Sequence, residues 1–325
     1  MSKGNTNKNL SEAKRNKSDE FYTQLPDIER ELKHYKNYFK DKTVYCNCDD
    51  PKISNFFNYF ALNFENLQLK KLITTCYKNQ DWNLFSQNAS EQAVYLEYEG
   101  DKNNNKLPDP EEIGIHPLKE DGDFRSDECI ELLKKSDIVV TNPPFSLFRE
   151  YVAQLIEHDK KFIIVGSFNA VTYKEIFKLI KDNKIWLGNG FQGGNAYFEP
   201  KDKSVFGKGV LDEKTGLVKF RNVTWFTNLD INKRHEDLIL YKSYDENSYS
   251  KYDNYDILNV DKLKEIPKDY KGVMGVPITF LDKYNPKQFE ILGIANSARW
   301  IDYECYTKIN GKKIYNRILI KNKTI

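Results

Sequence analysis

Residues 137–148 read DIVVTNPPFSLF, and this stretch decides the fold of the chain. Its apolar first half is typical of a buried strand. The prolines that follow remove backbone N–H donors and fix φ angles, so neither a strand nor a helix continues through them. The sequence therefore predicts a stiff, extended corner at the carboxyl end of a strand, made of Asn142, Pro143, Pro144 and Phe145. This proline corner offers carbonyl and amide oxygens that are suited to accept hydrogen bonds from an NH₂ group.

Short apolar runs also occur before and after the proline corner, separated by stretches of helical character. Strands are predicted in residues 42–46, 70–77 and 161–167, and helices in residues 52–64, 127–135 and 146–160. This alternation predicts an α/β fold with a mostly parallel sheet that helices cover on both faces. Ligands bind such sheets at the carboxyl ends of the strands. Polar segments at 46–51 and 121–126 are expected at the same edge as the proline corner, which predicts a binding site there.

The composition limits the class of protein and its compartment. The 325 residues carry a net charge of only +2, although 30% are charged and 14% are aromatic, which suits a soluble protein with locally basic surfaces. The number of Cys is five, and no long apolar run is present, so we expect a reduced, cytoplasmic protein without a membrane segment. Cys46 and Cys48 lack a second Cys or His pair at ligand spacing, so no metal site is predicted.

The two ends of the chain differ from its middle. Residues 1–17 form a basic arm that includes Lys14, Arg15 and Lys17, and this arm is either a frayed terminus or a segment that contacts nucleic-acid phosphates. Beyond about residue 190 the chain is rich in Gly, Asn, Lys and Tyr without a helical period. Residues 188–194 lack the Gly-Lys-Ser/Thr ending of a phosphate loop, and we interpret them as a flexible loop.

Several longer stretches carry a resemblance to a known family. They are KSDEFYTQ (17–24), VYCNCDDPKISNFFNYF (44–60), DGDFRS (121–126), LLKKSDIVVTNPPFSLFREY (132–151), KIWLG (184–188), KGVMGVPITFL (271–281) and RILIKNK (317–323). The chain resembles the EcoRI-type adenine-N6 DNA methyltransferases, which are class I amino-methyltransferases dependent on S-adenosylmethionine. The resemblance extends over about residues 7–323 and is weakest at 79–118 and 189–222.

This resemblance implies a Rossmann-like, doubly wound α/β fold with a C-terminal target-recognition region. It divides the chain into the basic arm (1–17), a cofactor-binding catalytic core (18–188), and late catalytic strands with the DNA target-recognition region (189–325).

The resemblance also assigns the proline corner to catalysis. An adenine N6 is a poor nucleophile because its lone pair is delocalised into the ring. If the Asn142 side-chain oxygen and the Pro143 carbonyl accept the N6 hydrogens, the nitrogen pyramidalises and its lone pair can face the methyl donor. The prolines, including Pro144, hold the acceptors rigid. Phe145 is expected to stack on the base, which must leave the duplex to reach this pocket.

Cofactor positions are implied in the same way. Phe21, Tyr22 and Thr23 match the segment that holds the methionine end of S-adenosylmethionine, while Asp123 and Phe124 match the segment that binds its adenine amine and ring. By its place in the motif, Asn142 is counted among the cofactor-binding residues as well.

Two cofactor positions depart from the usual pattern. The first strand–helix turn, which holds Cys46, Asn47, Asp49 and Asp50, lacks the usual Gly residues. Either of the two Asp residues is suited to receive the cofactor's ammonium group, and the sequence does not choose between them. Cys76 or Tyr77 stands where an acid for the ribose hydroxyls is expected, so the ribose contact stays open.

Trp225, in NVTWFTN (222–228), corresponds in order to a late catalytic motif, and it either walls the pocket of the flipped base or packs in the core.

Together the motifs imply a type II restriction–modification enzyme that methylates the inner adenine of GAATTC in double-stranded DNA. It would be paired in function with a cognate restriction endonuclease, without a stable protein partner. The alternatives are an RNA or protein-glutamine methyltransferase, which needs the same acceptors, and a non-enzymatic nucleic-acid-binding module.

Overall fold

The computed structural model describes residues 21–48, 54–75, 93–105, 108, 111–200, 211–212, 214–295 and 307–324. The chain forms two compact units: Met1–Phe168 with Gly190–Leu229, and Asn169–Asn189 with Asp230–Ile325. The predicted site residues Lys14, Arg15, Lys17, Asp49, Asp50 and Cys76 lie outside the described residues. The division into arm, catalytic core and recognition region is a functional one and stays a prediction.

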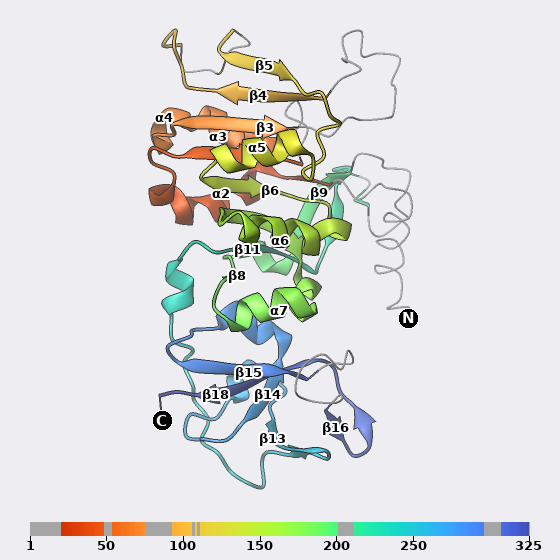
Figure 1. Ribbon diagram of the computed structural model, residues 1–325. Helices are drawn as coiled ribbons and strands as arrows, with labels where there is room; N and C mark the ends of the chain where they lie inside the picture. Colours follow the sequence, from red (N-terminus) through yellow and green to blue (C-terminus); the bar gives the residue numbers. More distant parts are fainter. Residues whose placement is uncertain are drawn as a thin grey trace. The chain divides into compact units, whose positions relative to one another are not determined.

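A mixed β-sheet forms the centre of the first unit. Its strands are β2 (Thr43–Cys46), β3 (Lys71–Thr75), β4 (Val94–Tyr98), β5 (Ile113–Pro117), β6 (Ile138–Thr141), β7 (Lys161–Ser167) and β11 (Val223–Thr227). They follow the order β5-β4-β3-β2-β6-β7-β11 (Figure 1). The neighbours among β3, β2, β6 and β7 are parallel, whereas β4, β5 and β11 run antiparallel to their neighbours. The sheet is thus parallel only at its centre. β4 and β5 form an antiparallel ribbon at one edge, and antiparallel neighbours can be joined without a crossover helix.

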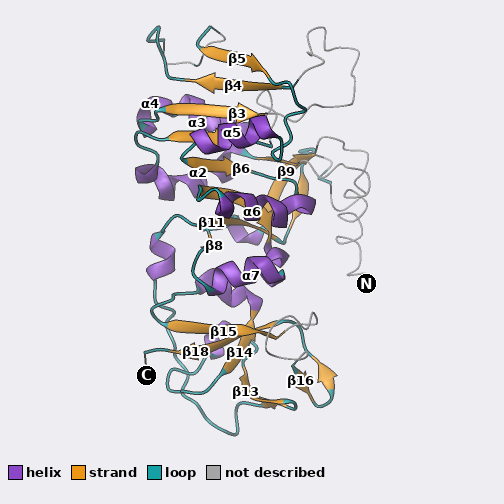
Figure 2. Ribbon diagram, in the orientation of Figure 1, coloured by secondary structure: helices purple, strands orange, loops and turns teal. Residues whose placement is uncertain are grey.

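Helices cover both faces of the parallel centre. They are α2 (Leu25–Leu32), α3 (Asn55–Leu62), α4 (Phe64–Leu67), α5 (Asp127–Lys135) and α6 (Phe148–Glu157), with the 3₁₀-helices η1 (Lys33–Tyr38), η2 (Phe145–Leu147) and η4 (Gln192–Gly194). In Figure 2, α5 and α6 lie in front of the sheet, and α3 lies behind it. Ser54 and Ser126 cap α3 and α5 by accepting hydrogen bonds from amides of the first turn, which explains where these helices begin.

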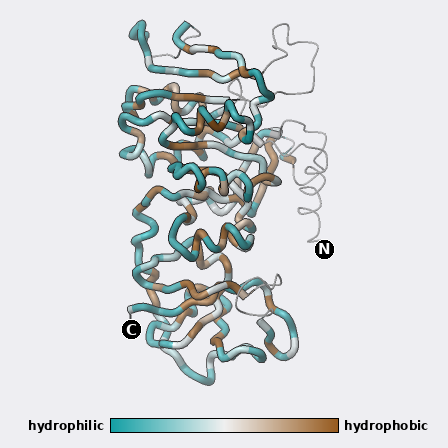
Figure 3. The backbone as a smooth tube through the Cα atoms, in the orientation of Figure 1, coloured by the Kyte–Doolittle hydropathy of each residue, from teal (hydrophilic) through white to brown (hydrophobic). Residues whose placement is uncertain are grey.

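The core of this unit lies along the central strands. Every residue of β2 and β6 is buried, as expected for strands with helices on both faces. Figure 3 shows the hydrophobic stretches in the inner strands and helices and hydrophilic ones in the loops. The continuous apolar runs that predicted these strands are therefore confirmed as buried strands.

A second, small sheet joins distant parts of the sequence. It has the order β1 (Phe21–Thr23), β9 (Ala196–Pro200) and β10 (Val218–Phe220), and all its pairs are antiparallel. Phe21 pairs with Pro200, and Thr23 pairs with Phe198. β9 begins just after the loop interpreted at 188–194 and lies within residues 189–222, where the resemblance is weakest. This stretch therefore supplies the strand that pairs with residues 21–23.

The second unit contains a sheet of its own. Its elements are α7 (Lys174–Lys181), β8 (Trp186–Leu187), β12 (Lys251–Tyr252), β13 (Tyr255–Asn259), β14 (Met274–Pro277), β15 (Phe289–Ala295), β16 (Lys308–Ile309), β17 (Lys312–Lys313), β18 (Arg317–Asn322) and the 3₁₀-helices η6 (Asn232–His235), η7 (Leu263–Glu265) and η8 (Ile278–Lys283). The sheet order is β12-β13-β14-β18-β15, and β16 and β17 form a separate hairpin. The 3₁₀-helix η3 (Phe168–Thr172) begins at the last residue of the first unit's first segment.

Candidate active site

The proline corner turns β6 directly into a helix. Asn142 is 7% exposed and Phe145 is 6% exposed, so both side chains lie mostly inside the protein. The Leu147 amide donates to the Pro144 carbonyl over 3.0 Å, which closes η2, and α6 begins at Phe148. The corner is therefore fixed on one side by a buried strand and on the other by a helix.

The turn after β2 lies beside this corner. Asn47 is only 2% exposed, and its backbone carbonyl accepts a hydrogen bond from Thr141 Oγ1 at the end of β6. The Cys46 carbonyl accepts a hydrogen bond from Thr74 Oγ1 of β3 over 2.7 Å. Cys48 has φ 69°, a left-handed conformation in which Gly is the usual residue. The backbone thus turns sharply here without the Gly that the usual pattern supplies.

The DGDFRS segment (121–126), here called the Asp123 loop, is held by one bidentate ion pair. Arg125 Nε donates to Asp123 Oδ1 over 2.8 Å, and Arg125 Nη2 donates to Asp123 Oδ2 over 2.6 Å. Burial acts to raise the pKa of Asp123, but the hydrogen bonds and charge of Arg125 together outweigh it and lower this pKa. Arg125 also lies 5.3 Å from the ring centre of Phe124 and 3.5 Å from Glu150 of α6. The Asp123 carboxylate therefore stays ionised and acts as an acceptor.

Helix α6 joins the corner to both of these loops. Tyr151 donates from its hydroxyl to Asn47 Oδ1, and its ring meets Phe124 edge-on at 5.0 Å. Gln154, nearly one turn later, donates from Nε2 to the Phe124 carbonyl over 3.0 Å. Burial first, and then nearby Cys48, raise the pKa of Tyr151 well above its ordinary value, so the hydroxyl keeps its proton. One helix thus positions the turn after β2 and the Asp123 loop relative to the proline corner.

Residues 21–23 lie near the start of α3. Asn55 Nδ2 donates to the Thr23 carbonyl over 2.8 Å. Within the described residues, Thr23 Oγ1 and Gln154 Oε1 are buried without a hydrogen-bond partner. Such atoms cost about 1–3 kcal/mol each when nothing satisfies them, so they mark places suited to a polar ligand or water.

Comparison with known proteins identifies the family. The family model described as "Adenine-specific methyltransferase EcoRI" matches residues 9–323. The chain belongs to this family. It is 52% identical to the type II methyltransferase M.EcoRI of Escherichia coli over 100% of this chain and 99% of that protein. It is 39% identical to the type II methyltransferase M.MgeORF184P of Mycoplasma genitalium, over 97% of this chain and 99% of that protein.

A third relative is the type II methyltransferase M.MpnI of Mycoplasma pneumoniae, 38% identical over 97% of this chain and 98% of that protein. No solved structure matches the chain significantly. The predicted family is therefore confirmed, and the protein is an adenine-specific methyltransferase of the restriction–modification type.

In this methyltransferase, Trp225 lies in the core of the first unit. It has no exposed surface, stacks on Phe191 at 5.6 Å and meets Phe56 edge-on at 6.0 Å. Its Nε1 is buried and has no hydrogen-bond partner among the described residues. This packing agrees with the interpretation of Trp225 as a core residue, and its role as a wall of the base pocket stays a prediction.

Sequence reasoning missed several residues that hold the methyltransferase site together. Arg125, Tyr151 and Gln154 were not singled out, although all lie inside or directly after the stretches that resemble the family. Glu31 was missed as well: it is fully buried, accepts from Tyr35 Oη over 2.8 Å and accepts from the Gly190 amide over 3.1 Å. The signal available for Glu31 was its place between Ile28 and Leu32, which are apolar at helical spacing, because a carboxylate buried among such residues needs partners.

In the part of the chain that the structure describes, no group of three or more His, Cys, Asp or Glu side chains is arranged to hold a metal ion. No helix among the described residues is both long and apolar enough to span a bilayer.

Proposed function

We propose that the protein transfers the methyl group of S-adenosylmethionine to N6 of the inner adenine of GAATTC in duplex DNA. It would act in a type II restriction–modification system beside a cognate endonuclease and without a stable protein partner. The membership of the EcoRI family and the 52% identity to M.EcoRI support this specificity. The observation that carries the proposal is the proline corner, buried at the carboxyl end of β6 and tied through α6 to the turn after β2 and to the Asp123 loop.

The proposed fold assignment is a Rossmann-like, doubly wound core. The parallel strands β3, β2, β6 and β7, with helices on both faces, support it (Figure 2). In such sheets a ligand lies outside the carboxyl ends of the strands where the strand order reverses, which here is between β2 and β6. Residues 189–325 would add late catalytic strands and the target-recognition region, and Lys14, Arg15 and Lys17 of the arm would contact DNA phosphates.

The described residues fit the cofactor's polar and aromatic groups. Asp123 is an ionised acceptor for the adenine amine: a carboxylate has about four acceptor positions, and Arg125 occupies only part of them. Phe124 provides an apolar surface beside it. Phe21, Tyr22 and Thr23 would hold the methionine end, where the unsatisfied Thr23 Oγ1 offers a hydroxyl.

The remaining cofactor contacts follow from the turn after β2. Cys46 and Asn47 would line the ligand with their backbone, and Asp49 or Asp50 would receive the ammonium group. Cys76 would stand near the ribose. Asn142 would contact the methionine end as well as the target base.

The bound cofactor would supply an electrophilic methyl group on a sulfonium. The protein's part is to hold the adenine N6 in line with that methyl group. The Asn142 side-chain oxygen and the Pro143 carbonyl would accept the N6 hydrogens and stabilise the positive charge that develops on nitrogen. Pro144 fixes the backbone, so the acceptors need not reorganise during transfer.

Adenine must leave the duplex to reach this corner, at a cost of a few kcal/mol in stacking and pairing. Phe145 would stack on the extruded base, and Trp225 would wall its pocket. Since both side chains are nearly or fully buried, base entry would require the surrounding aromatic side chains to shift.

The test is methyl transfer from labelled S-adenosylmethionine to a GAATTC duplex. Matched duplexes would carry N6-methyladenine at the inner or at the outer adenine of both strands. Transfer should be lost with the inner adenine blocked and kept with the outer one blocked. Transfer to tRNA, rRNA or a glutamine peptide instead of DNA would replace this function with the alternative one. Methylome sequencing of cells that express the chain would report any other recognition sequence.

A further inference from the structure

Gln154 of α6 has a side-chain amide of which only one half is satisfied. Its Nε2 donates to the Phe124 carbonyl over 3.0 Å. Its Oε1 is buried and has no hydrogen-bond partner among the residues that the structure describes. The residue as a whole is half-buried, so the amide lies where the core of the first unit meets its surface. A buried acceptor without a donor is unfavourable, and this oxygen therefore marks a place for a donor that the folded chain does not itself provide.

The orientation of this amide is fixed by its neighbour. A backbone carbonyl accepts hydrogen bonds and donates none, so the Phe124 carbonyl requires the NH₂ end of the Gln154 amide. An amide turned the other way would bring two carbonyl oxygens together and lose the bond. The Gln154 side chain therefore offers a fixed acceptor, and not a donor, beside the Asp123 loop.

The loop beside Gln154 contributes a second acceptor. The Asp123 carboxylate stays ionised because the hydrogen bonds and charge of Arg125 lower its pKa. Asp123 directly precedes Phe124 in the chain and Gln154 binds the Phe124 carbonyl, so both acceptors adjoin the same residue. Tyr151, on the same face of α6 as Gln154, holds the Phe124 ring by an edge-on contact at 5.0 Å. A ligand that matches two acceptors beside an aromatic ring carries two N–H donors on a flat group, which describes an aromatic amine.

We propose that Gln154 Oε1 accepts the second hydrogen of the adenine amine of S-adenosylmethionine, beside Asp123, which accepts the first. The inference rests on the proposed function and adds a specificity-determining residue to its cofactor site. An amine has two N–H donors, and a buried one needs an acceptor for each of them. With Asp123 alone, one N–H would stay unsatisfied when the adenine is buried. Gln154 completes a pair of acceptors that favours a 6-aminopurine over a purine with hydrogen or oxygen at that position.

The test compares two ligands that differ only at the amine. They are S-adenosylhomocysteine, which is what methyl transfer leaves of the cofactor, and its analogue with hydrogen in place of the 6-amino group. Calorimetry measures both affinities for the wild type and for Gln154→Met, which has a similar length and no amide. The wild type should prefer S-adenosylhomocysteine, and Gln154→Met should reduce that preference about tenfold, because one of the two bonds to the amine is lost. Tyr151→Phe is the matched control: it removes the bond to Asn47, so it should weaken both ligands equally and leave the preference unchanged.

A second variant and the melting temperatures separate this role from a purely structural one. Gln154→Glu keeps an acceptor oxygen at the position and should retain the preference, and its loss there would overturn the proposal. An unchanged preference in a folded Gln154→Met protein would also overturn it and leave the proposed function intact. So would an equal reduction by Tyr151→Phe, since the effect would then come from a loosened Asp123 loop. Failure of the wild type to bind either ligand would instead remove the proposed cofactor and the proposed function with it.

Discussion

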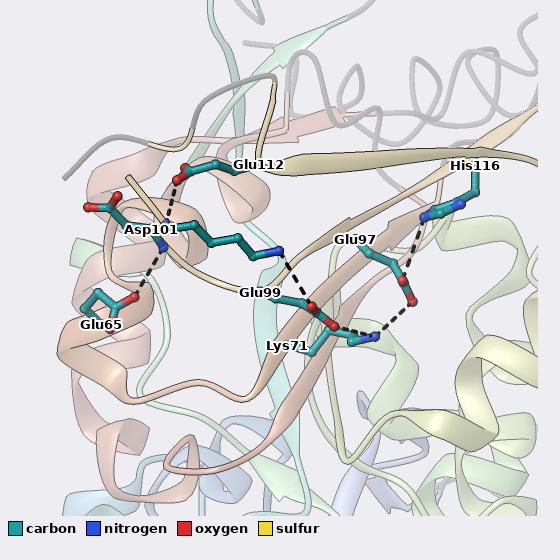
Figure 4. Close-up of polar contacts among 8 residues, drawn as sticks. Glu65, Lys71, Glu97, Glu99, Asp101, Glu112 and His116 are labelled. Atoms are coloured by element: carbon teal, nitrogen blue, oxygen red, sulfur yellow. Dashed lines mark hydrogen bonds and ion pairs between the residues drawn. The ribbon is translucent and has the colours of Figure 1, made fainter. Parts of the chain in front are cut away.

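In the first unit, polar side chains gather in two regions: the loops at the carboxyl ends of the strands β2 and β6, and the outer β4–β5 ribbon. The two regions differ in how far their side chains are exposed to solvent. At the carboxyl ends, Asn47, Thr141 and Tyr151 are buried and joined by neutral hydrogen bonds. Where β3 borders the ribbon, Lys71 of β3 lies 3.4 Å from Glu97 and 3.0 Å from Glu99, and the side chains remain partly exposed (Figure 4). His116 extends this network from β5, 3.8 Å from Glu97.

Buried hydrogen bonds keep the strand ends rigid, whereas the ion pairs beside the ribbon belong to a solvated surface. Removing one partner of a buried hydrogen bond leaves the other unsatisfied and costs about 1–3 kcal/mol. A partly exposed ion pair contributes about 0–1 kcal/mol, because water and salt screen it. We therefore expect substitutions at the carboxyl ends to have much larger effects than substitutions on the ribbon.

The largest effect is expected at Asn142. Asn142→Ala removes one proposed acceptor of the N6 hydrogens and leaves the prolines and the cofactor loops in place. Single-turnover methyl transfer should fall at least about a hundredfold, by analogy with the loss of one oxyanion-hole donor. Cofactor affinity should change far less, since the interaction is made mainly in the transition state. Near-normal transfer by a folded variant would remove Asn142 from the mechanism.

The next effect concerns folding at the same edge. Tyr151→Phe leaves Asn47 Oδ1 buried without its donor, so the free energy of unfolding should fall by about 1–3 kcal/mol, and cofactor affinity should fall with it. Tyr95→Phe on β4 is the matched control: this ring stacks on His116 at 4.7 Å in a more exposed position, and its change should stay within about 0.5 kcal/mol. Urea denaturation of both variants compares the two regions directly. Equal losses would contradict the distinction between them.

A smaller, pH-dependent effect is expected at Arg125. Without this partner, burial is the main remaining influence on Asp123, and it raises the pKa of that carboxyl. Arg125→Gln should therefore lose cofactor affinity as the pH falls through the mildly acidic range, by about tenfold for each unit by which the pKa exceeds the pH. The wild type, whose Asp123 pKa is lowered, should keep its affinity there. Calorimetric titrations from about pH 5 to pH 8 measure this, with Arg125→Lys as a variant that retains the charge. Parallel pH profiles would exclude the proposed role of Arg125.

The smallest effect is expected at Lys71, the β3 residue whose ion pairs reach the ribbon. Lys71→Met retains the apolar part of the side chain and removes the ion pairs, so stability should change by no more than about 1 kcal/mol and methyl transfer should not change. The hydrogen bond from Lys71 lowers the pKa of Glu99, so this contribution is present at neutral pH and disappears as Glu99 is protonated in acid. High salt should also remove it. A loss of transfer would show that the ribbon supports the site.

The features that sequence reasoning predicted are those with local causes. Continuous apolar runs predicted the buried strands β2, β6 and β7, and the prolines at 143 and 144 predicted the corner after β6. Features that depend on distant partners were not predictable in this way. β1 pairs with β9 across most of the first unit's sequence, and Tyr151 bonds Asn47 across 104 positions.

Two further features depend on tertiary packing that local patterns do not contain. The Gly-rich loop at 188–194 is held at one point by the hydrogen bond from the Gly190 amide to Glu31, and β9, which follows it, pairs with β1. The turn after β2 lacks Gly, and the left-handed conformation falls on Cys48 instead. Tertiary packing sets the conformation of the loop before β9 and of the turn at Cys48, and the pattern of residues along the sequence does not contain this packing.

The contacts of α6 have a consequence for hydrogen exchange. Since this helix begins at the proline corner and holds both loops through Tyr151 and Gln154, none of the three can open without breaking contacts to the others. Their amides should exchange in one cooperative unit. A cofactor that binds only the closed form slows opening of the whole unit, by about a factor of a hundred at a free concentration one hundred times its Kd. Slower hydrogen exchange of the α6 amides would thus report that the cofactor is bound, although the backbone of α6 supports the cofactor site from outside.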